Sequence, residues 1–326
     1  MAGVGARSAA VGLASTLSWM LVSSALIIAN KRVYSKGFAY PMFVTGVGQL
    51  ASALGGLLLG WLSGKRSRSL PPLGWLVPTL GPMWGFTFLT MWLGNAAYLH
   101  LSVAFIQIFK AMTPAVTLVL AVIAGQERLT LPLLASVTLI ALGTGGATFV
   151  ETGAPSWSAL GALFFVGSSF TEAARVVGSQ RLMSAHHFTS VETLVYVSLP
   201  AAALLIGGSL VSEGTGPLLL LRGVAGALAP IQGELAYAAA LSFLVNLTSF
   251  WAIGSTGSLT FKVAGCLKNL AVIWYSVAVS REHVSGAQLG GYLVSVAGFM
   301  LYTLAKSQPS GRAVAPAAGA EKAKAA

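Results

Sequence analysis

Charged residues are scarce in this chain of 326 residues: they make up 8% of it, against about 25% in an ordinary soluble domain. Hydrophobic residues make up 56%, and the mean hydropathy is +0.80. A water-soluble fold of this size could not bury so much apolar surface, so the composition predicts a protein whose solvent is the lipid bilayer. The net charge of +11 does not indicate a nucleic-acid partner, because the basic residues separate hydrophobic runs instead of sharing one polar face.

Cysteine and histidine are also rare. The one cysteine, Cys266, excludes an intrachain disulfide, and the four histidines show no metal-ligand spacing. The sequence has no nucleophile elbow, no glycine-rich phosphate loop with a lysine, and no paired carboxylates. We therefore predict that the protein is not an enzyme and uses neither a cofactor nor a metal. Without a nucleotide-hydrolysis motif, any transport that it performs is expected to be secondary.

Little polar sequence precedes the first hydrophobic run. Ten residues lie before Val11, with Arg7 as their single charge. The run from Val11 to Ala29 is long enough to span a bilayer, so we interpret it as a signal anchor. No long Ser/Arg-rich transit peptide is seen, which argues against a plastid or mitochondrial inner membrane.

Long hydrophobic runs dominate the rest of the chain. A membrane span needs about 20 mostly apolar residues, and runs of this kind, divided by charges, proline and glycine, give ten candidates. They lie near 10–30, 41–62, 74–97, 101–124, 131–150, 157–181, 190–211, 233–254, 258–279 and 285–305. We predict an all-α polytopic membrane protein of about ten helices. The distribution of basic residues between the runs favours both termini on the cytosolic side.

The two halves of the chain resemble each other. Matching residues recur at offsets of 150 to 155 positions: Asn30 and Gln180, Asn95 and Asn246, Glu127 and Glu282, Gly143 and Gly298. Five spans per half is an odd number, so the second half must enter the membrane upside down. We predict one transmembrane domain over 1–307, built from inverted repeats near 8–150 and 156–305, and a disordered cytosolic tail over 308–326. Such repeats place a carrier's substrate site near the midplane.

Lys110 is the clearest ionisable residue inside a predicted span, where such groups are costly and usually functional. It lies nine residues into the run 101–124, roughly 14 Å deep at 1.5 Å per residue. Gln107 and Thr113 lie one turn before and one turn after it, and Pro114 frees the Lys110 carbonyl from its helical hydrogen bond. This combination suits a phosphate group. The structural alternative is that Lys110 pairs with a buried acid or with carbonyl groups.

Lys268 lies ten residues into the ninth predicted span. In an inverted repeat this depth is comparable to that of Lys110. The neighbouring Asn269 offers an amide that could bind a base, a sugar or a phosphate. Two lysines from opposite halves that meet at the midplane would form a site for a divalent anion.

Other polar residues within the predicted spans carry weaker signals. Lys262 lies four residues into the ninth span, where it either extends to the cytosolic face or serves as a charge on the access path. Glu172 and Arg175 are three positions apart on one helical face and are expected to pair. Asn95 and Tyr98 end the third span and are further candidates for contact with a substrate.

Two long segments resemble a known family. The stretch N-A-A-Y-L-H-L-S-V-A-F-I-Q-I-F-K-A-M-T-P, Asn95 to Pro114, and the stretch T-S-F-W-A-I-G-S-T-G-S-L-T-F-K-V-A-G-C-L-K-N, Thr248 to Asn269, resemble the triose-phosphate translocator family of the drug/metabolite transporter superfamily. The similarity runs over roughly 10–305 and is strongest to its plant and algal probable sugar phosphate/phosphate translocators. It implies strict exchange of anions, with Lys110 and Lys268 in the positions of phosphate-contacting lysines.

One position departs from that pattern. Plastid phosphate translocators of the family follow the ninth-span lysine with arginine, whereas this chain has Asn269. The site therefore has one cation fewer than a triose-phosphate site. Because nucleotide-sugar transporters of the family vary here, the resemblance implies a nucleotide sugar at least as readily as a sugar phosphate.

The tail contains Lys322 and Lys324 in a K-x-K-x-x arrangement. Dilysine signals of this kind are bound by a coat-protein receptor that returns proteins to the endoplasmic reticulum or early Golgi; the alternative is a disordered Ala/Lys-rich tail. We therefore expect a Golgi or endoplasmic reticulum membrane, with the plastid envelope as the alternative.

Together these observations give one leading hypothesis and two alternatives. The leading one is an antiporter that exchanges a nucleotide sugar or sugar phosphate for a nucleotide monophosphate or inorganic phosphate. The first alternative is a carrier of a non-phosphorylated metabolite on the same fold, in which buried lysines pair with acids. The second is a membrane scaffold that transports nothing.

Overall fold

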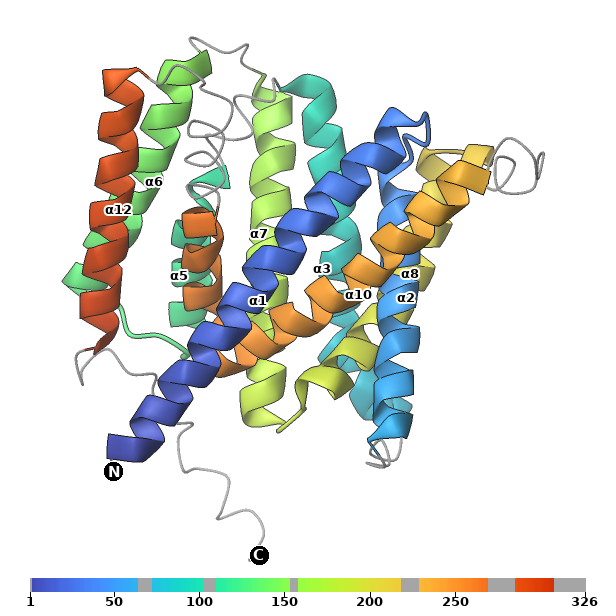
Figure 1. Cartoon of the computed structure of the whole chain (residues 1–326), viewed down its shortest axis with the longest axis horizontal. Coiled ribbons are helices and arrows are strands. Elements are labelled where there is room, and N and C mark those ends of the chain that lie inside the picture. Colours follow the sequence, from blue (N-terminus) through green and yellow to red (C-terminus); the bar gives the residue numbers. More distant parts are fainter. Residues whose placement is uncertain are drawn as a thin grey trace, which may run out of the picture. The chain divides into compact units, whose positions relative to one another are not determined.

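The computed structural model describes residues 2–63, 72–101, 110–152, 158–217, 229–268 and 285–307. Within these ranges the regular secondary structure is helical, which confirms the predicted all-α class (Figure 1). The named helices are α1 (Ala2–Ser35), α2 (Pro41–Leu62), α3 (Leu73–His100), α5 (Thr113–Ile123), α6 (Leu131–Thr152), α7 (Ala159–Ala185), α8 (Ser190–Ser212), α10 (Ala229–Thr256) and α12 (Gly286–Ser307). A further helical stretch covers 258–268.

Six helices in the described ranges are long and apolar enough to cross a bilayer; these are parts of α1, α2, α7, α8, α10 and α12. Shorter apolar stretches occupy Thr113–Ile123 and Leu131–Ala147. The protein is thus a multi-pass membrane protein. The number of ten spans stays a prediction, because parts of the predicted runs 101–124 and 258–279 lie outside the described residues.

Local sequence signals explain where two of these helices begin. Thr189 and Glu192 form a capping box at α8: the Thr189 hydroxyl accepts from the Glu192 amide, and the Glu192 carboxylate accepts from the Thr189 amide. Pro41 occupies the first turn of α2, where its missing amide hydrogen costs nothing. The Glu213 carboxylate accepts from the next two amides, Met42 at 2.7 Å and Phe43 at 3.1 Å. A carboxylate at this end also complements the helix dipole.

The described helices divide between two compact units, and each unit takes helices from both halves of the sequence. The first unit runs to Gly94 and resumes over Gly178–Gly257. In it α1 packs along α10, and α2 packs against both α8 and α10 (Figure 1). Asn246 of α10 donates a hydrogen bond to the Ser52 hydroxyl of α2 at 2.9 Å. This residue, half of one predicted repeat pair, therefore links two helices.

The second unit comprises Asn95–Val177 and the chain from Ser258 onward. Its core includes Leu118 of α5, Ile140 of α6, and Leu259 and Val263 of the stretch 258–268. Tyr302 of α12 completes this core, and its hydroxyl shares a hydrogen bond of 2.7 Å with Thr260. These contacts hold the 258–268 stretch against α5, α6 and α12.

Helices α6 and α12 of the second unit lie side by side (Figure 1). Two glycines allow this close approach. A Cβ atom at Gly143 would lie 2.6 Å from the Gly291 carbonyl oxygen, and one at Gly298 would lie 2.8 Å from the Ile140 amide nitrogen. Small residues at such crossings let helix backbones meet without a gap.

Candidate functional site

The fourth predicted span is interrupted directly after Lys110. Lys110 is helical, Ala111 and Met112 form a turn, and α5 starts at Thr113 with Pro114 in its first turn. The amides of Ala115 and Val116 both donate to the Met112 carbonyl, at 3.0 and 3.3 Å. Proline has no amide hydrogen and is best accommodated in the first turn of a helix, so Pro114 is compatible with a new helix that starts at Thr113.

This break has electrostatic consequences for an anion near Lys110. The N-terminus of a helix carries a partial positive charge, so the start of α5 adds to the positive potential beside the lysine. Interrupted helices of this kind form the substrate sites of many secondary carriers. Thr113 is buried at the first position of α5.

Four cations of the second unit are linked by electrostatic interactions, three of them with the Glu172 carboxylate and the fourth, Lys268, with Lys110. We call Lys110, Arg175, Lys262 and Lys268 the cation cluster. Lys262 Nζ donates to Glu172 Oε1 at 2.5 Å. Glu172 also interacts electrostatically with Arg175 and Lys110. The charges of Lys110 and Lys268 are near enough to repel each other. The structure thus brings together the two lysines that the sequence proposed for one site.

The members of the cation cluster differ in exposure. The Lys262 side chain is 11% exposed and that of Glu172 is 37% exposed. Lys268 is half-buried and Lys110 is exposed. Lys262 is therefore largely buried beside the Glu172 carboxylate. The pairing of Glu172 also differs from the expected one: its ion pair is with Lys262, and the charge of Arg175 acts on it in addition.

The remaining candidates for substrate contact are less well defined. Asn95 is half-buried near the C-terminal end of α3. Gln107 and Asn269 lie outside the described residues, as does the side chain of Tyr98. Their roles stay predictions.

A second ion pair in the same unit was missed by sequence reasoning. Lys306, in the last turn of α12, donates to the buried Glu127 in the connection between α5 and α6 at 2.5 Å. The adjacent Gln126 donates to the Val177 carbonyl at 2.8 Å and accepts from the Ser258 hydroxyl at 3.4 Å. One signal could have predicted this ion pair. Lys306 lies at the end of the last predicted span, on the side of the membrane where Glu127 is also expected.

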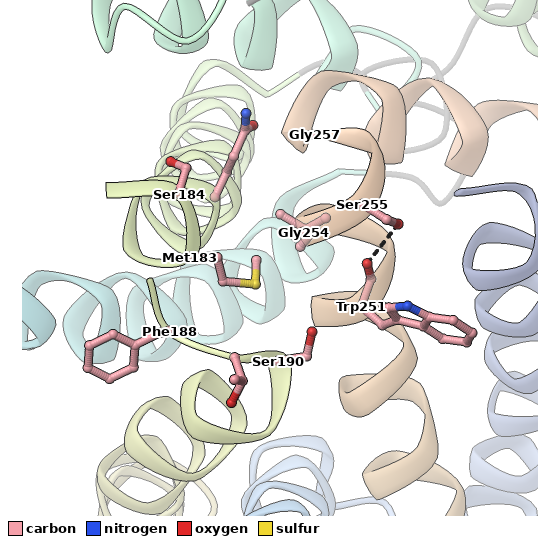
Figure 2. Close-up of a pocket in the computed structure, with 11 residues that line it drawn as sticks. Met183, Ser184, Phe188, Ser190, Trp251, Gly254, Ser255 and Gly257 are labelled. Carbon is pink, nitrogen blue, oxygen red and sulfur yellow. Dashed lines mark hydrogen bonds between the residues drawn. The ribbon is translucent and has the colours of Figure 1, made fainter. Parts of the chain in front are cut away.

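A separate hollow of about 380 Å³ lies in the first unit, where α7 ends, α8 begins and α10 ends (Figure 2). Its lining is rich in hydroxyl and amide groups, including Gln180, Ser184, Ser190 and Ser255, and none of its lining residues is charged. The Ser255 hydroxyl donates to the carbonyl of Trp251 at 2.8 Å, within its own helix. A lining without cations is poorly suited to a phosphate, so the cation cluster is the better candidate for an anion site.

Comparisons with known proteins agree with a transport role. A model of the Triose-phosphate Transporter family matches residues 10–303. A probable sugar phosphate/phosphate translocator of Arabidopsis thaliana is 28% identical over 301 residues, covering 89% of this chain and 78% of that protein. A second from the same plant is 28% identical over 314 residues, covering 91% and 87%. One crystal structure superposes with a TM-score of 0.65 at 17% identity, over 92% of this chain and 97% of the other. At that identity the superposition shows the fold alone.

Proposed function

We propose that this chain, which belongs to the Triose-phosphate Transporter family, is a secondary antiporter. It exchanges a nucleotide sugar or sugar phosphate for a nucleotide monophosphate or inorganic phosphate. The family and the translocator relatives are transporters and not enzymes. The observation that carries the proposal is the cation cluster, which concentrates positive charge within α7 and two of the predicted spans.

In this proposal the phosphate binds between Lys110 and Lys268. The two ammonium groups repel each other when the site is empty, and a dianionic phosphate replaces this repulsion with two attractions. Charge-assisted hydrogen bonds to phosphate oxygens are about twice as strong as neutral ones. The start of α5 beside Lys110 adds its partial positive charge.

The same electrostatics support exchange over one-way transport. Moving the excess positive charge of the cation cluster through a closed, low-dielectric state is costly. A bound anion removes most of that charge, so the carrier changes state with an anion on board. Net movement of one solute then requires a counter-anion for the return step.

The proposed inverted repeats are supported by the crossing of α6 and α12. Gly143 lies against Ser295, and Gly298 lies against Ile140. Residues 143 and 298 are 155 positions apart, as are residues 140 and 295. Each contact is therefore the repeat counterpart of the other, as expected where equivalent spans of two inverted halves pack together.

One observation favours the alternative function, a carrier of a non-phosphorylated metabolite. That alternative predicts buried lysines paired with acids, and Lys262 is paired with Glu172. Exchanging the two residues, Lys262→Glu with Glu172→Lys, keeps the pair and the net charge. Under the alternative this double variant transports at the wild-type rate. Under anion exchange it loses activity, because a carboxylate then occupies the position of a site cation.

Reconstituted exchange tests the main proposal. Liposomes preloaded with inorganic phosphate or nucleotide monophosphates are supplied with labelled sugar phosphates and nucleotide sugars outside. The proposal expects uptake that needs the internal anion and is lost in Lys110→Ala and Lys268→Ala. Wild-type exchange by Lys110→Ala contradicts the site. No uptake across the whole panel by folded protein leaves the carrier of a non-phosphorylated solute, or a scaffold.

The membrane in which the carrier works is a further part of the proposal. We propose the Golgi or endoplasmic reticulum, with the plastid envelope as the alternative, on the spacing of Lys322 and Lys324. If a coat-protein receptor binds these lysines, replacing both with serine moves a fluorescent fusion out of the early secretory pathway. A plastid location of the intact fusion supports the alternative.

A further inference from the structure

Glu172 has the wrong charge for a residue in an anion site. It lies in the central part of α7 (Ala159–Ala185), a helix long and apolar enough to span the membrane. Its carboxylate holds Lys262 at 2.5 Å and interacts with the charges of Arg175 and Lys110. An ionisable residue at such a depth is costly and indicates function by default. Phosphate binding between Lys110 and Lys268 does not by itself give Glu172 a function.

The exposed fractions of Lys262 and Glu172 indicate which of the two side chains is freer to change its partner. Lys262 is largely enclosed, with 11% of its side chain exposed, whereas 37% of the Glu172 side chain is exposed. A buried ammonium group requires an anionic partner. Glu172 supplies one, and its own side chain is only partly buried. An entering phosphate would offer Lys262 and Lys110 a second, more highly charged partner.

We propose that Glu172 is a resident counter-ion of the cation cluster, which competes with the anionic solute for Lys262 and Lys110 and thereby sets the affinity for phosphate. This inference rests on the proposed function and deepens it. In the empty carrier the carboxylate neutralises part of the cluster. When a phosphate binds, the carboxylate repels it, so binding is weaker and release is faster than the cations alone would give.

Glu172→Gln separates this role from a structural one. Glutamine has nearly the same shape and retains an oxygen that accepts from Lys262 Nζ, but it carries no charge. Removing one like charge from a site of effective dielectric constant about 20 is expected to tighten phosphate binding on the order of tenfold. Because release is then slower, the KM and the maximal exchange rate should both fall.

Lys262→Gln gives the opposite expectation. It leaves Glu172 without its ion-pair partner, so the carboxylate acts more strongly on Lys110, and phosphate binding should weaken. The double variant, with both residues changed to glutamine, should bind phosphate more tightly than Lys262→Gln alone. A pair that only holds α7 to the 258–268 stretch would change the melting temperature in these variants without tightening anion binding in any of them.

The experiment uses the full chain, purified in detergent and reconstituted in parallel. Binding is followed as the rise in melting temperature during titration with inorganic phosphate and glucose 6-phosphate, with glucose as the uncharged reference. Glu234→Gln is the matched control: it removes a carboxylate whose partner is the exposed Lys36, at 2.9 Å in the other unit. It should leave phosphate affinity unchanged.

The outcomes are distinguishable. Tighter phosphate binding by Glu172→Gln, together with unchanged binding by Glu234→Gln, supports the inference. Equal or weaker binding by Glu172→Gln, with a wild type that does bind phosphate, overturns the inference and leaves the proposed function standing. A folded wild type that binds neither phosphate nor glucose 6-phosphate overturns both. Should Glu172→Gln fail to fold, unchanged phosphate affinity in Lys262→Gln overturns the inference.

Discussion

The crossing of α6 and α12 makes a sharp prediction, because two glycines of the same helix have opposite surroundings. A methyl group at Gly143 would lie 2.6 Å from the Gly291 carbonyl oxygen, the Ser295 amide nitrogen and the Ser295 hydroxyl. Two of these atoms belong to the backbone and cannot rotate away. At Gly146, one turn further along, nothing lies within 4 Å of the added Cβ.

Gly143→Ala should therefore force the two helices apart, at the cost of about 1–3 kcal/mol that is typical of overpacking. Gly146→Ala should be neutral or stabilising by up to about 1 kcal/mol, because alanine favours a helix over glycine. The opposite signs arise within one turn of one helix, so differences in membrane insertion or expression affect both variants alike.

Melting temperatures of the two variants in the same detergent provide the assay. We expect Gly143→Ala to melt below the wild type and Gly146→Ala to melt at or above it. Gly298→Ala should behave like Gly143→Ala, since its added Cβ would lie 2.8 Å from the Ile140 amide nitrogen. If Gly143→Ala and Gly146→Ala melt together, the close crossing of α6 and α12 is refuted.

Three further predictions concern single residues. Lys306→Met should destabilise the protein by about 3–5 kcal/mol, because it leaves the buried Glu127 carboxylate unneutralised, and adding Glu127→Gln should restore much of the loss in a thermal melt. Thr189→Ala removes the N-cap of α8 and should cost about 1 kcal/mol, measured in the same melt against Ser184→Ala as a surface control. Asn269→Arg adds a cation beside Lys268 and should lower the KM for inorganic phosphate in exchange assays; an unchanged KM places position 269 outside the site.

Span positions were largely predictable from the sequence, but the ends of some helices were not. The run 41–62 coincides with α2 (Pro41–Leu62), because proline starts this helix and the apolar run ends with it. In contrast, α1 continues to Ser35, five residues past the predicted run 10–30. Hydropathy reports where the apolar environment ends. A helix can continue into water with Lys31 and Arg32 on its surface, since its backbone hydrogen bonds are internal.

In the candidate site, features set by neighbouring residues were predictable from the sequence, whereas contacts between distant residues were not. Lys110 was singled out by its depth and by Pro114, and the break at Ala111–Met112 is compatible with that proline. The partner of Glu172 was not predictable in this way. The spacing rule for helices favoured Arg175, three positions away, whereas the ion pair is with Lys262, ninety positions away in the chain. Only tertiary packing brings α7 and the 258–268 stretch together.

The net charge of the cation cluster affects which classes of solute the proposed site could distinguish. Among the described residues, the cation cluster holds four cations and interacts with one carboxylate, Glu172, so its positive charge exceeds its negative charge even with Glu172 ionised. A phosphate monoester carries about −1.5 to −2 at neutral pH, and the diphosphate of a nucleotide sugar carries a similar charge. Under the proposed function, such a cluster would favour phosphorylated solutes over neutral ones by a large margin but would separate the two phosphorylated classes weakly. Discrimination between them must come from neutral groups that contact the sugar or the base. Asn95 and Asn269 are the proposed candidates for such groups, and Asn269 is the position at which this chain departs from the arginine that the resemblance implies for plastid phosphate translocators.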